Sequence, residues 1–392
     1  MDFRLTAEQE AFRAAVARFV DAEVVPQATA LDEAGEFPRT LFRRLAEQGF
    51  LGLRYPEAYG GSGADMVTYC LFAEELARGS MSLAALAAMQ SLMGTYFVYR
   101  YGSEDLRQRY LVPALRGEKI ATFGLTEPNA GSDVASITTF AERVEGGFRL
   151  KGTKTWVTNA PVADMLTVCA KTSRERGMKH IALFLVDRAF PGVTLGKKID
   201  KQGVRASATG EILLDDVVVP DGHLLGGETG GVEKVGGILS EIRVMTGALA
   251  VGLGRAAYGA ALRYARERTT FGKPIVEHQA ISFKLADMLT QLHAASLLVY
   301  HAAWAIDQGL PVTREAAMTK LFASEAANRI CDEASRVFAS YSFATEYPVE
   351  RYFRDARFLL WGGGTSEILR VIIGRDLDRP PILGGPARGG QE

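Results

Sequence analysis

The residue types that most often carry metal or nucleophile chemistry are few in this chain and poorly spaced for it. Its 392 residues include five histidines and three cysteines. Cys70, Cys169 and Cys331 are widely separated and lie outside any CxxC, which predicts neither a disulfide framework nor a zinc site and suits a reducing compartment. His293 and His301 lie eight residues apart on an expected helix without acidic or cysteine neighbours, so we expect packed side chains and no metal ligands.

Glycine-containing segments provide no phosphate-binding loop either. Residues 252–259, GLGRAAYG, have the wrong spacing for a dinucleotide fingerprint and lie within a helical pattern, which favours close helix packing. Residues 192–198, GVTLGKK, are one residue short of a P-loop and lack its Ser or Thr. The chain also has no GxSxG nucleophile elbow. Chemistry based on a P-loop or on such a serine is therefore not expected.

The segment FGLTEPNAGSD, residues 123–133, lies where helical patterns give way to strand patterns. It lacks the apolar run of a core element, and Pro128, Asn129 and Gly131 are turn formers, so taken alone it predicts a loop. Trp156 alone would be a core aromatic, because large aromatic side chains mostly fill volume. Only the joint pattern of such residues with others along the chain indicates a ligand site.

Composition and charge are those of a soluble globular enzyme. Hydrophobic residues make up 47% and charged residues 23%, and 45 basic residues are balanced by 46 acidic ones, so no nucleic-acid partner is expected. The N-terminus, MDFRLTAEQEAF, has no apolar core after a basic start, which argues against a secretory signal and for a cytoplasmic protein. Residues 79–99 carry no charge and have the length of a membrane span, but five polar residues interrupt them. We expect a buried core helix there and no membrane partner.

The hydrophobic periods divide the chain into helical, strand and helical regions. Thr6 is the expected N-cap of a first helix, with Gln9 as its capping-box partner, and a second helix is expected over Arg39–Gln48. From about Ala121 the apolar runs become short and β-branched or alternating, which predicts an antiparallel sheet with a hairpin turn at Gly146–Gly147.

Helical patterns return from Gly236, and this order predicts an α+β protein. The expected helices are Ile238–Arg268, His278–Asp307, Arg314–Tyr341 and Ser366–Asp376. The expected domains are an N-terminal helical domain at 1–120, a middle β-domain at 121–232, a C-terminal helical domain at 233–379 and a disordered Pro/Gly-rich tail at 380–392.

Several segments, in the same order along the chain, resemble motifs of the acyl-CoA dehydrogenase family. Residues 123–133 resemble the family signature, and KGTKTWVTNA, residues 151–160, resembles its next flavin-facing strand. Further matches are QGVRASAT at 202–209, RERTTFGKPIVEHQA at 266–280, EYPVERYFRDAR at 346–357 and GTSEI at 364–368. The resemblance covers essentially the whole chain. It implies an N-terminal all-α domain, a middle antiparallel β-domain and a C-terminal four-helix bundle, usually in a homotetramer or homodimer.

The resemblance also implies the chemistry. FAD is the implied cofactor, and the implied substrate is an acyl group held as a thioester to CoA or to a carrier protein. The default reaction is α,β-dehydrogenation, and an electron-transfer flavoprotein is one implied electron acceptor.

The resemblance further assigns residues to the flavin. One set would line the flavin ring: Phe123, Leu125, Thr126, Trp156 and Thr158. Ser132 would hold the flavin or the thioester arm, and Thr365 and Glu367 follow the turn beside the flavin. A second set matches the motif by which one subunit reaches its neighbour's FAD: Arg268, Thr270, Phe271 and Gln279. An arginine in such a position can pair with the pyrophosphate through its planar fork.

One departure from the family lies before residue 346. Glycines are common where this chain has Ala339, Ser340 and Ser342, and a glutamine is usual where it has Arg336. Those glycines permit close approach of a neighbouring chain to the adenosine end of FAD. FAD binding is still expected, with Arg336 among its contacts.

A larger departure concerns the catalytic base. Many members place a glutamate just before the GTSEI-like turn, where this chain has Gly363, whose N–H is still expected to bind the thioester carbonyl. Arg243 matches an arginine on the helix that lines the active site. Other members place the glutamate directly before that arginine, but here the position is Ile242. Glu241 is the remaining candidate base, although it lies about 100° away on an ideal helix and would need a bulge to point inward.

Three functions stay open on these residues. The first is dehydrogenation of an acyl thioester with a relocated base. The second is chemistry that needs no carboxylate base, such as loss of sulfinate or carboxylate, redox-neutral cyclisation or flavin oxygenation. The third is a non-catalytic flavoprotein. Acyl-chain length would depend on pocket depth at Met89, Gln90, Thr95 and Tyr96.

Overall fold

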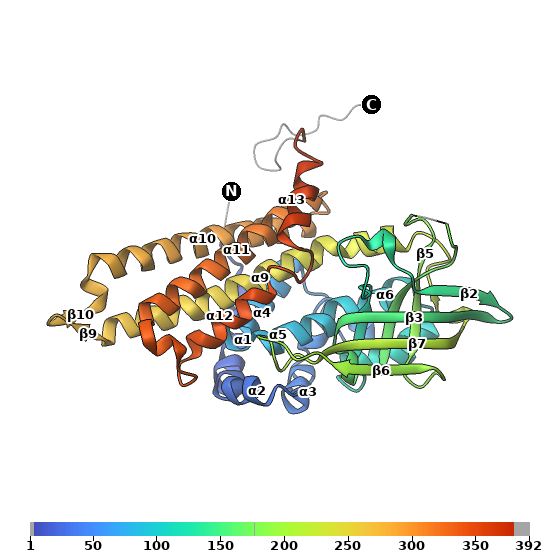
Figure 1. Cartoon of the computed structure of the whole chain (residues 1–392), viewed down its shortest axis with the longest axis horizontal. Helices are drawn as coiled ribbons and strands as arrows, with labels where there is room; N and C mark the ends of the chain where they lie inside the picture. Colours follow the sequence, from blue (N-terminus) through green and yellow to red (C-terminus); the bar gives the residue numbers. More distant parts are fainter. Residues whose placement is uncertain (1–3, 176, 380–392) are drawn as a thin grey trace.

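The structure is a computed structural model that describes residues 4–175 and 177–379. Its elements follow one another as helices, a sheet and helices again, which confirms the predicted α+β order (Figure 1). The tail expected at 380–392 lies outside the described residues.

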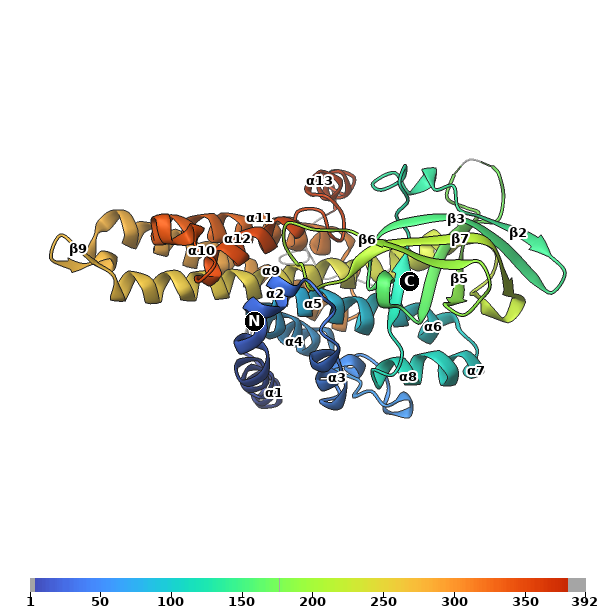
Figure 2. The same cartoon turned by 60° about the horizontal axis from the view of Figure 1, so that its bottom comes forward.

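The first helical region packs beneath the sheet and the C-terminal helices in the turned view (Figure 2). Its helices are α1 Ala7–Phe19, α2 Ala28–Ala34, α3 Arg39–Glu47, α4 Met66–Gly79, α5 Met81–Ala88, α6 Thr95–Tyr101, α7 Glu104–Leu106 and α8 Val112–Leu115. The predicted capping box of α1 is confirmed, because the Gln9 N–H donates to the Thr6 hydroxyl and the Thr6 N–H donates to the Gln9 side chain, each at 3.1 Å.

Two helical stretches are long and apolar enough to cross a membrane by length and composition alone. They are Met81–Tyr101 and α9, Gly231–Glu267. In their most apolar windows, 89% and 72% of the residues are buried inside the protein, as in the core helices of a folded domain. The buried core helix expected over 79–99 is therefore confirmed.

The middle region is one twisted sheet with strand order β6-β7-β3-β2-β4-β5-β8, and β1 pairs with β4. The strands are β1 Ala121–Gly124, β2 Phe140–Val144, β3 Gly147–Thr158, β4 Met165–Lys171, β5 Ile181–Asp187, β6 Val193–Lys198, β7 Thr209–Pro220 and β8 Leu224–Leu225. Alternate side chains of β3 and β7 are largely buried, whereas β4 and β5 are buried at every residue but the last, because both of their faces are covered.

Two details of the sheet differ from the sequence prediction. Most neighbours are antiparallel, but β1 runs parallel to β4, with Ala121 opposite Met165. The β2–β3 hairpin pairs Val144 with Gly147, so its loop is Glu145–Gly146, one residue earlier than predicted. Gly146 adopts φ +74°, and this left-handed requirement fixes which glycine lies in the turn.

The last region is built on α9, which runs from the sheet to the far tip of the molecule (Figure 1). The other helices are α10 Gln279–Asp307, α11 Thr313–Phe338, α12 Pro348–Phe358 and α13 Ser366–Gly374. A short hairpin of β9, Thr269–Thr270, and β10, Lys273–Pro274, closes the tip. Helix α9 begins seven residues before the predicted Ile238, because burial against the sheet overrides the low helix propensity of Gly236 and Gly237.

Candidate active site

The turn between α12 and α13 places Gly363 against α9. Gly363 has φ +74°, and a Cβ built on it would lie 3.2 Å from the Thr246 Oγ1 and 3.8 Å from the Ile242 Cγ2. The Thr365 hydroxyl then caps α13 by accepting the Ile368 N–H at 3.2 Å. Within the described residues the Gly363 N–H forms no hydrogen bond, so it is free to donate to a ligand carbonyl.

Lys320 on α11 holds the other side of this turn. Its Nζ donates to the Gly364 carbonyl at 2.6 Å, and the side chain is fully buried. Burial is the main cause that lowers the pKa of Lys320 to about 8. The nearby Glu325 carboxylate acts in the opposite direction, and the positive charge of Arg243 lowers the pKa further. The sequence prediction missed this residue, because a single lysine in a helical pattern gives no signal that it faces inward.

Arg243 lies one residue beyond Ile242 on α9. Its exposed fraction is 7%, and its Nε is buried without an acceptor among the described residues. Burial lowers the pKa of its guanidinium, with no carboxylate acting against that shift. Arg243 is therefore an uncompensated cation close to the Gly363 turn.

Glu241 is engaged elsewhere. Its carboxylate forms an ion pair with Arg54 at 2.9 Å, and Arg54 also donates to the Ala64 carbonyl at 3.0 Å. This contact ties α9 to the loop before α4. The residues of α9 that face Gly363 are Ile242 and Thr246, so the geometry argues against Glu241 as the base.

Part of the ring-lining set converges where β1 ends beside β3. The Thr155 N–H donates to the Thr126 carbonyl at 3.0 Å, which brings Thr126 next to Trp156. Trp156 has φ +56° at a register shift of β3, and 60% of it is exposed. The Thr126 and Thr158 hydroxyls form no hydrogen bond within the part of the chain that the structure describes. An exposed indole whose neighbouring residues carry free hydroxyls fits a flat, polar-edged ring such as a flavin.

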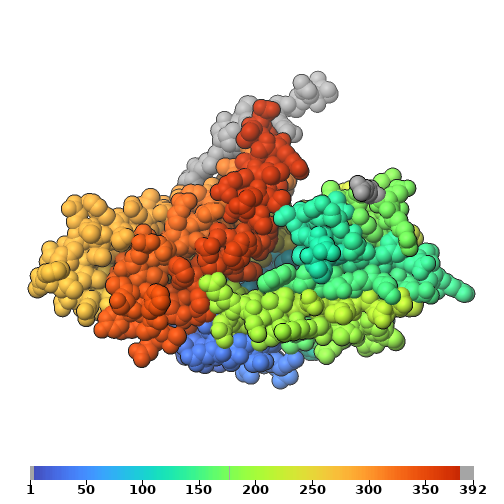
Figure 3. Space-filling view, in the orientation of Figure 1, coloured from blue at the N-terminus to red at the C-terminus, as the bar shows by residue number. Residues whose placement is uncertain are grey.

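Phe123 and Leu125 differ in their environments. Phe123 is buried and stacks on Phe97 with ring centroids 4.9 Å apart, so it supports the site from the helical core. Leu125 is partly exposed beside Thr126, and Ser132 is exposed in the following loop. The space-filling view shows a recess between this part of the β-region and the red α13 (Figure 3).

A buried ion pair that the sequence prediction missed fixes the loop after β1. Lys154 donates to Glu127 at 2.7 Å and to the Leu125 carbonyl at 3.2 Å, and Glu127 also accepts the Thr139 N–H at 2.9 Å. Burial alone would raise the pKa of Glu127, but Lys154 and the donors of Thr138 and Thr139 lower it to about 2. Glu127 thus stays ionised and anchors the backbone that carries Thr126.

The second predicted set lies far from the first. Arg268, Thr270, Phe271 and Gln279 gather at the β9–β10 tip, where Phe271 has φ +50° and is 95% exposed. The 37 residues of α9 separate this tip from the sheet, which corresponds to about 55 Å of helix (Figure 1). The structure therefore does not bring the two sets together within one chain.

Two other residues predicted to contact FAD form ordinary ion pairs at the protein surface. Arg336 is exposed and donates to Asp332 at 2.7 Å, and Glu367 lies 3.9 Å from Arg370 on the surface of α13. Of the residues expected to set acyl-chain length, Gln90 and Thr95 are fully buried. The Gln90 amide forms hydrogen bonds with backbone groups, and the Thr95 hydroxyl forms one with the Tyr55 hydroxyl. We assign both of these side chains to structure.

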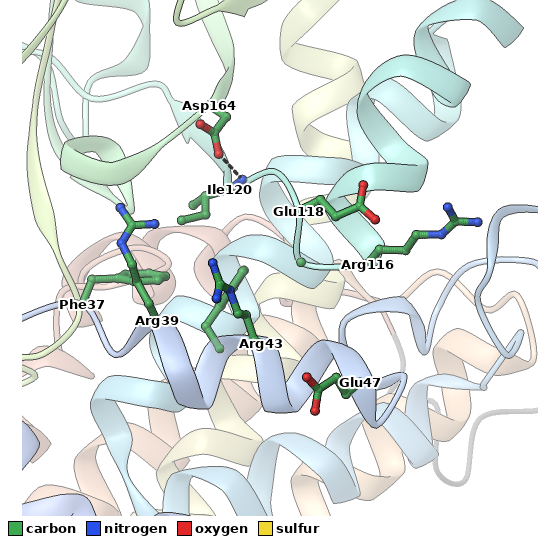
Figure 4. A pocket seen from close by; sticks show the side chains of 10 residues that line it. Phe37, Arg39, Arg43, Glu47, Arg116, Glu118, Ile120 and Asp164 are labelled. Carbon is green, nitrogen blue, oxygen red and sulfur yellow. Dashed lines mark hydrogen bonds between the residues drawn. The ribbon is translucent and has the colours of Figure 1, made fainter.

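A surface cavity of about 400 Å³ lies between α3 and the segment after α8, away from these residues (Figure 4). Its charged side chains are of both signs, three arginines and three carboxylates: Arg39, Arg43, Arg116, Glu47, Glu118 and Asp164. The Asp164 carboxylate accepts the Ile120 N–H at 2.8 Å, which is a structural contact. The cavity contains none of the predicted site residues.

Comparisons with known proteins agree with the geometry. Three family models match consecutive segments of the chain. They describe the N-terminal domain of acyl-CoA dehydrogenases, which matches residues 6–118, the middle domain, which matches 122–217, and the C-terminal domain, which matches 229–377. A benzylmalonyl-CoA dehydrogenase of Aromatoleum aromaticum is 54% identical over 378 residues, covering 96% of this chain and 100% of that protein.

Solved structures give the same result. Butyryl-CoA dehydrogenase of Megasphaera elsdenii matches with a TM-score of 0.93 and 37% identity, covering 96% of this chain and 100% of that one. An FAD complex of PigA matches with a TM-score of 0.93 and 29% identity, covering 96% and 99% of the two chains. The fold, the family and the cofactor predicted from the motifs are confirmed. The chain belongs to the acyl-CoA dehydrogenase family, the FAD-dependent oxidoreductases that act on acyl-CoA thioesters.

Proposed function

We propose that this chain is an atypical acyl-CoA dehydrogenase that oxidises α-carboxyacyl-CoA thioesters, in which the acyl α-carbon carries a carboxylate. Loss of that carboxylate as CO2 replaces removal of an α-proton. The observation that carries this proposal is that Gly363, which has no side chain, lies against Ile242 and Thr246 of α9, so neither position at which the family resemblance implies a glutamate holds a carboxylate.

The chemistry follows from the missing base. The α-proton of a thioester is weakly acidic, so ordinary dehydrogenation needs a carboxylate held against the α-carbon. In an α-carboxyacyl thioester, the bond to the carboxylate breaks and leaves its electron pair on the α-carbon. The β-hydrogen departs with two electrons, which bound FAD accepts as a hydride. The products are CO2 and an α,β-unsaturated thioester, so charge and electrons balance without a protein base.

The residues of the chain would bind and orient the substrate. The free Gly363 N–H is placed to donate to the thioester carbonyl, which stabilises negative charge that develops on its oxygen. Trp156, Thr126 and Thr158 would hold the flavin ring. The benzylmalonyl-CoA dehydrogenase that resembles this chain supports the substrate class, because a benzylmalonyl thioester carries its second carboxylate on the α-carbon.

The test compares benzylmalonyl-CoA with 3-phenylpropionyl-CoA, which differs only by the α-carboxylate. Mixed anaerobically with the FAD-loaded enzyme, benzylmalonyl-CoA is expected to bleach the flavin and release one CO2 for each flavin reduced. The carboxyl-free thioester is expected to leave the flavin oxidised. Rapid bleaching by the carboxyl-free thioester would instead indicate a protein base and contradict the proposal.

We further infer that the enzyme is a cytoplasmic homo-oligomer, a tetramer or a dimer, in which each FAD contacts two copies of the chain. The position of the second set at the β9–β10 tip, beyond the end of α9, supports this arrangement, because the single chain does not bring the two sets together. An electron-transfer flavoprotein is the proposed acceptor of the electrons.

A further inference from the structure

Most buried charges in the described residues have an opposite charge within ion-pair distance. Lys154 pairs with Glu127 at 2.7 Å, and Arg314 pairs with Glu315 at 2.7 Å. Such pairing offsets the large desolvation penalty of a buried ion. Arg243 departs from this pattern, because within residues 4–175 and 177–379 it forms neither an ion pair nor a hydrogen bond.

The position of Arg243 is defined by its neighbours on α9. Ile242 and Thr246, on either side of it along the helix, both face Gly363. A Cβ built on Gly247, one helical turn after Arg243, would lie 2.9 Å from the Thr319 Cγ2 on α11. Arg243 therefore lies between the Gly363 turn and α11, beside Lys320.

A second cation strengthens the positive potential of this place. Lys320 donates to the Gly364 carbonyl at 2.6 Å, and no carboxylate among the described residues lies within ion-pair distance of its Nζ. Lys320 follows Thr319, which packs against α9 one turn after Arg243, and the Arg243 charge lowers the pKa of Lys320. Arginine does not release its proton, so only an anion can compensate Arg243.

We propose that Arg243 binds the α-carboxylate of the substrate, with Lys320 as a positioning residue that fixes the turn and adds positive charge. This inference rests on the proposed function and names the group that recognises its substrate class. The α-carbon joins the thioester carbonyl directly to the carboxylate. When the carbonyl accepts the Gly363 N–H, the carboxylate is a short distance away, on the side where Gly363 has no side chain and α9 passes.

The same arrangement accounts for how the carboxylate would be oriented. The planar guanidinium can donate two parallel hydrogen bonds to one carboxylate, which fixes the rotation of that group about its bond to the α-carbon. Ile242 provides an apolar wall beside it, and an apolar wall favours departure of neutral CO2 over retention of the carboxylate. Arg243 would thus act in recognition and orientation of the leaving group.

The experiment measures binding to the FAD-loaded enzyme by calorimetry. Malonyl-CoA and acetyl-CoA differ by the α-carboxylate alone, and neither has a β-carbon that could be oxidised. The wild-type enzyme is expected to bind malonyl-CoA at least about tenfold more tightly than acetyl-CoA. In Arg243→Gln the ratio is expected to fall to about one, and in Arg243→Lys, which keeps the charge but loses the fork, to an intermediate value.

Arg263→Gln is the matched control, because it removes the same charge from an exposed position of α9 and should leave the ratio unchanged. Equal binding of the two thioesters by the wild-type enzyme would overturn the inference. This comparison uses the wild-type enzyme alone, so it does not depend on whether the variants fold. A ratio that survives in Arg243→Gln with normal FAD content would overturn it as well.

The outcome is separable from that of the proposed function. If benzylmalonyl-CoA reduces the flavin with release of CO2 but malonyl-CoA binds no more tightly than acetyl-CoA, the Arg243 site is refuted and the proposed reaction is supported. A preference that depends on Arg243, without CO2 release from benzylmalonyl-CoA, supports the carboxylate site and refutes the reaction.

Discussion

At the scale of single residues, the site is characterised by where carboxylates are absent and where cations are present. Gly363 and Ile242 face one another, while Glu241 is held by Arg54. Arg243 and Lys320 lie buried beside the same turn. A protein base would need a negative side chain here, whereas the chain presents Ile242, the Thr246 hydroxyl and positive charge. These residues suit a substrate that brings its own negative charge.

Replacement of Gly363 by alanine is expected to destabilise the protein by about 1 to 2 kcal/mol. The backbone at φ +74° is left-handed, which costs about that much for a residue with a Cβ. The new Cβ would also lie 3.2 Å from the Thr246 Oγ1, so Thr246 must shift. Chemical unfolding of the FAD-loaded protein measures the change.

Gly374→Ala serves as the control, because a Cβ there meets nothing within 4 Å and the glycine is helical. An equal effect in the two variants would show that neither the conformation nor the contact at Gly363 matters. The same strain applies to Gly363→Glu, so any gain of dehydrogenase activity in that variant has to be compared with Gly363→Ala.

The sequence predicted part of this site and missed the rest for a physical reason. Gly363, Ile242 and Arg243 could be identified because each occupies a fixed position within a motif. Lys320 and Glu127 could not, since a charged residue on a helix or in a loop is normally solvated. Only the fold shows that both are buried and that each holds a backbone group next to the site.

At the scale of elements, the sheet and the C-terminal helices are joined by the loop before β7. The Asp355 carboxylate on α12 accepts the Val204 N–H at 2.5 Å, and Arg354 donates to the Gln202 carbonyl at 3.0 Å. Val204 has φ +52°, a conformation that a β-branched residue adopts only when its surroundings enforce it. This contact holds the loop of the QGVRAS segment onto α12.

Asp355 is expected to make stability depend on pH. Burial raises its pKa from 3.8 to about 7, although the Val204 N–H and the nearby Arg351 and Arg354 act in the opposite direction. Between about pH 4 and pH 7 the folded protein therefore holds a proton that the unfolded chain releases, so a rise of pH through this window lowers stability.

Asp355→Asn keeps an acceptor for Val204 and removes the titration. Urea unfolding of both proteins at several pH values should show the wild type losing stability relative to this variant up to about pH 7 and levelling off above it. A difference between the two proteins that does not change with pH would contradict the expected titration.

Element types were largely predictable, and their ends were less so. The capping box of α1 and the strand runs from Ala121 are local patterns, so they could be read from the sequence. The start of α9 could not, because packing against the sheet sets it despite two glycines. The parallel pairing of β1 with β4 joins residues more than forty positions apart, which no local pattern encodes.

At the scale of the whole molecule, α9 separates the two sets of residues that are predicted to bind the flavin. Trp156 and Thr126 lie at the sheet, and Arg268 and Phe271 lie at the β9–β10 tip (Figure 1). Phe271 is almost fully exposed in the single chain, as expected for a residue that completes its contacts on another copy. Under the proposed assembly, every FAD site is therefore shared between two chains.

This separation predicts that defects in the two sets complement one another. A Trp156→Ala chain and an Arg268→Gln chain should each retain little FAD when produced alone. When the two are produced together with different tags and the mixed assembly is isolated, one kind of site contains both intact sets and should retain FAD.

A mixture of Arg268→Gln and Phe271→Ala chains, which are damaged in the same set, should not recover FAD. Equal FAD content in the two mixtures would contradict the shared site. Under the proposed assembly, the length of α9 thus makes this enzyme a protein in which two inactive alleles together restore function.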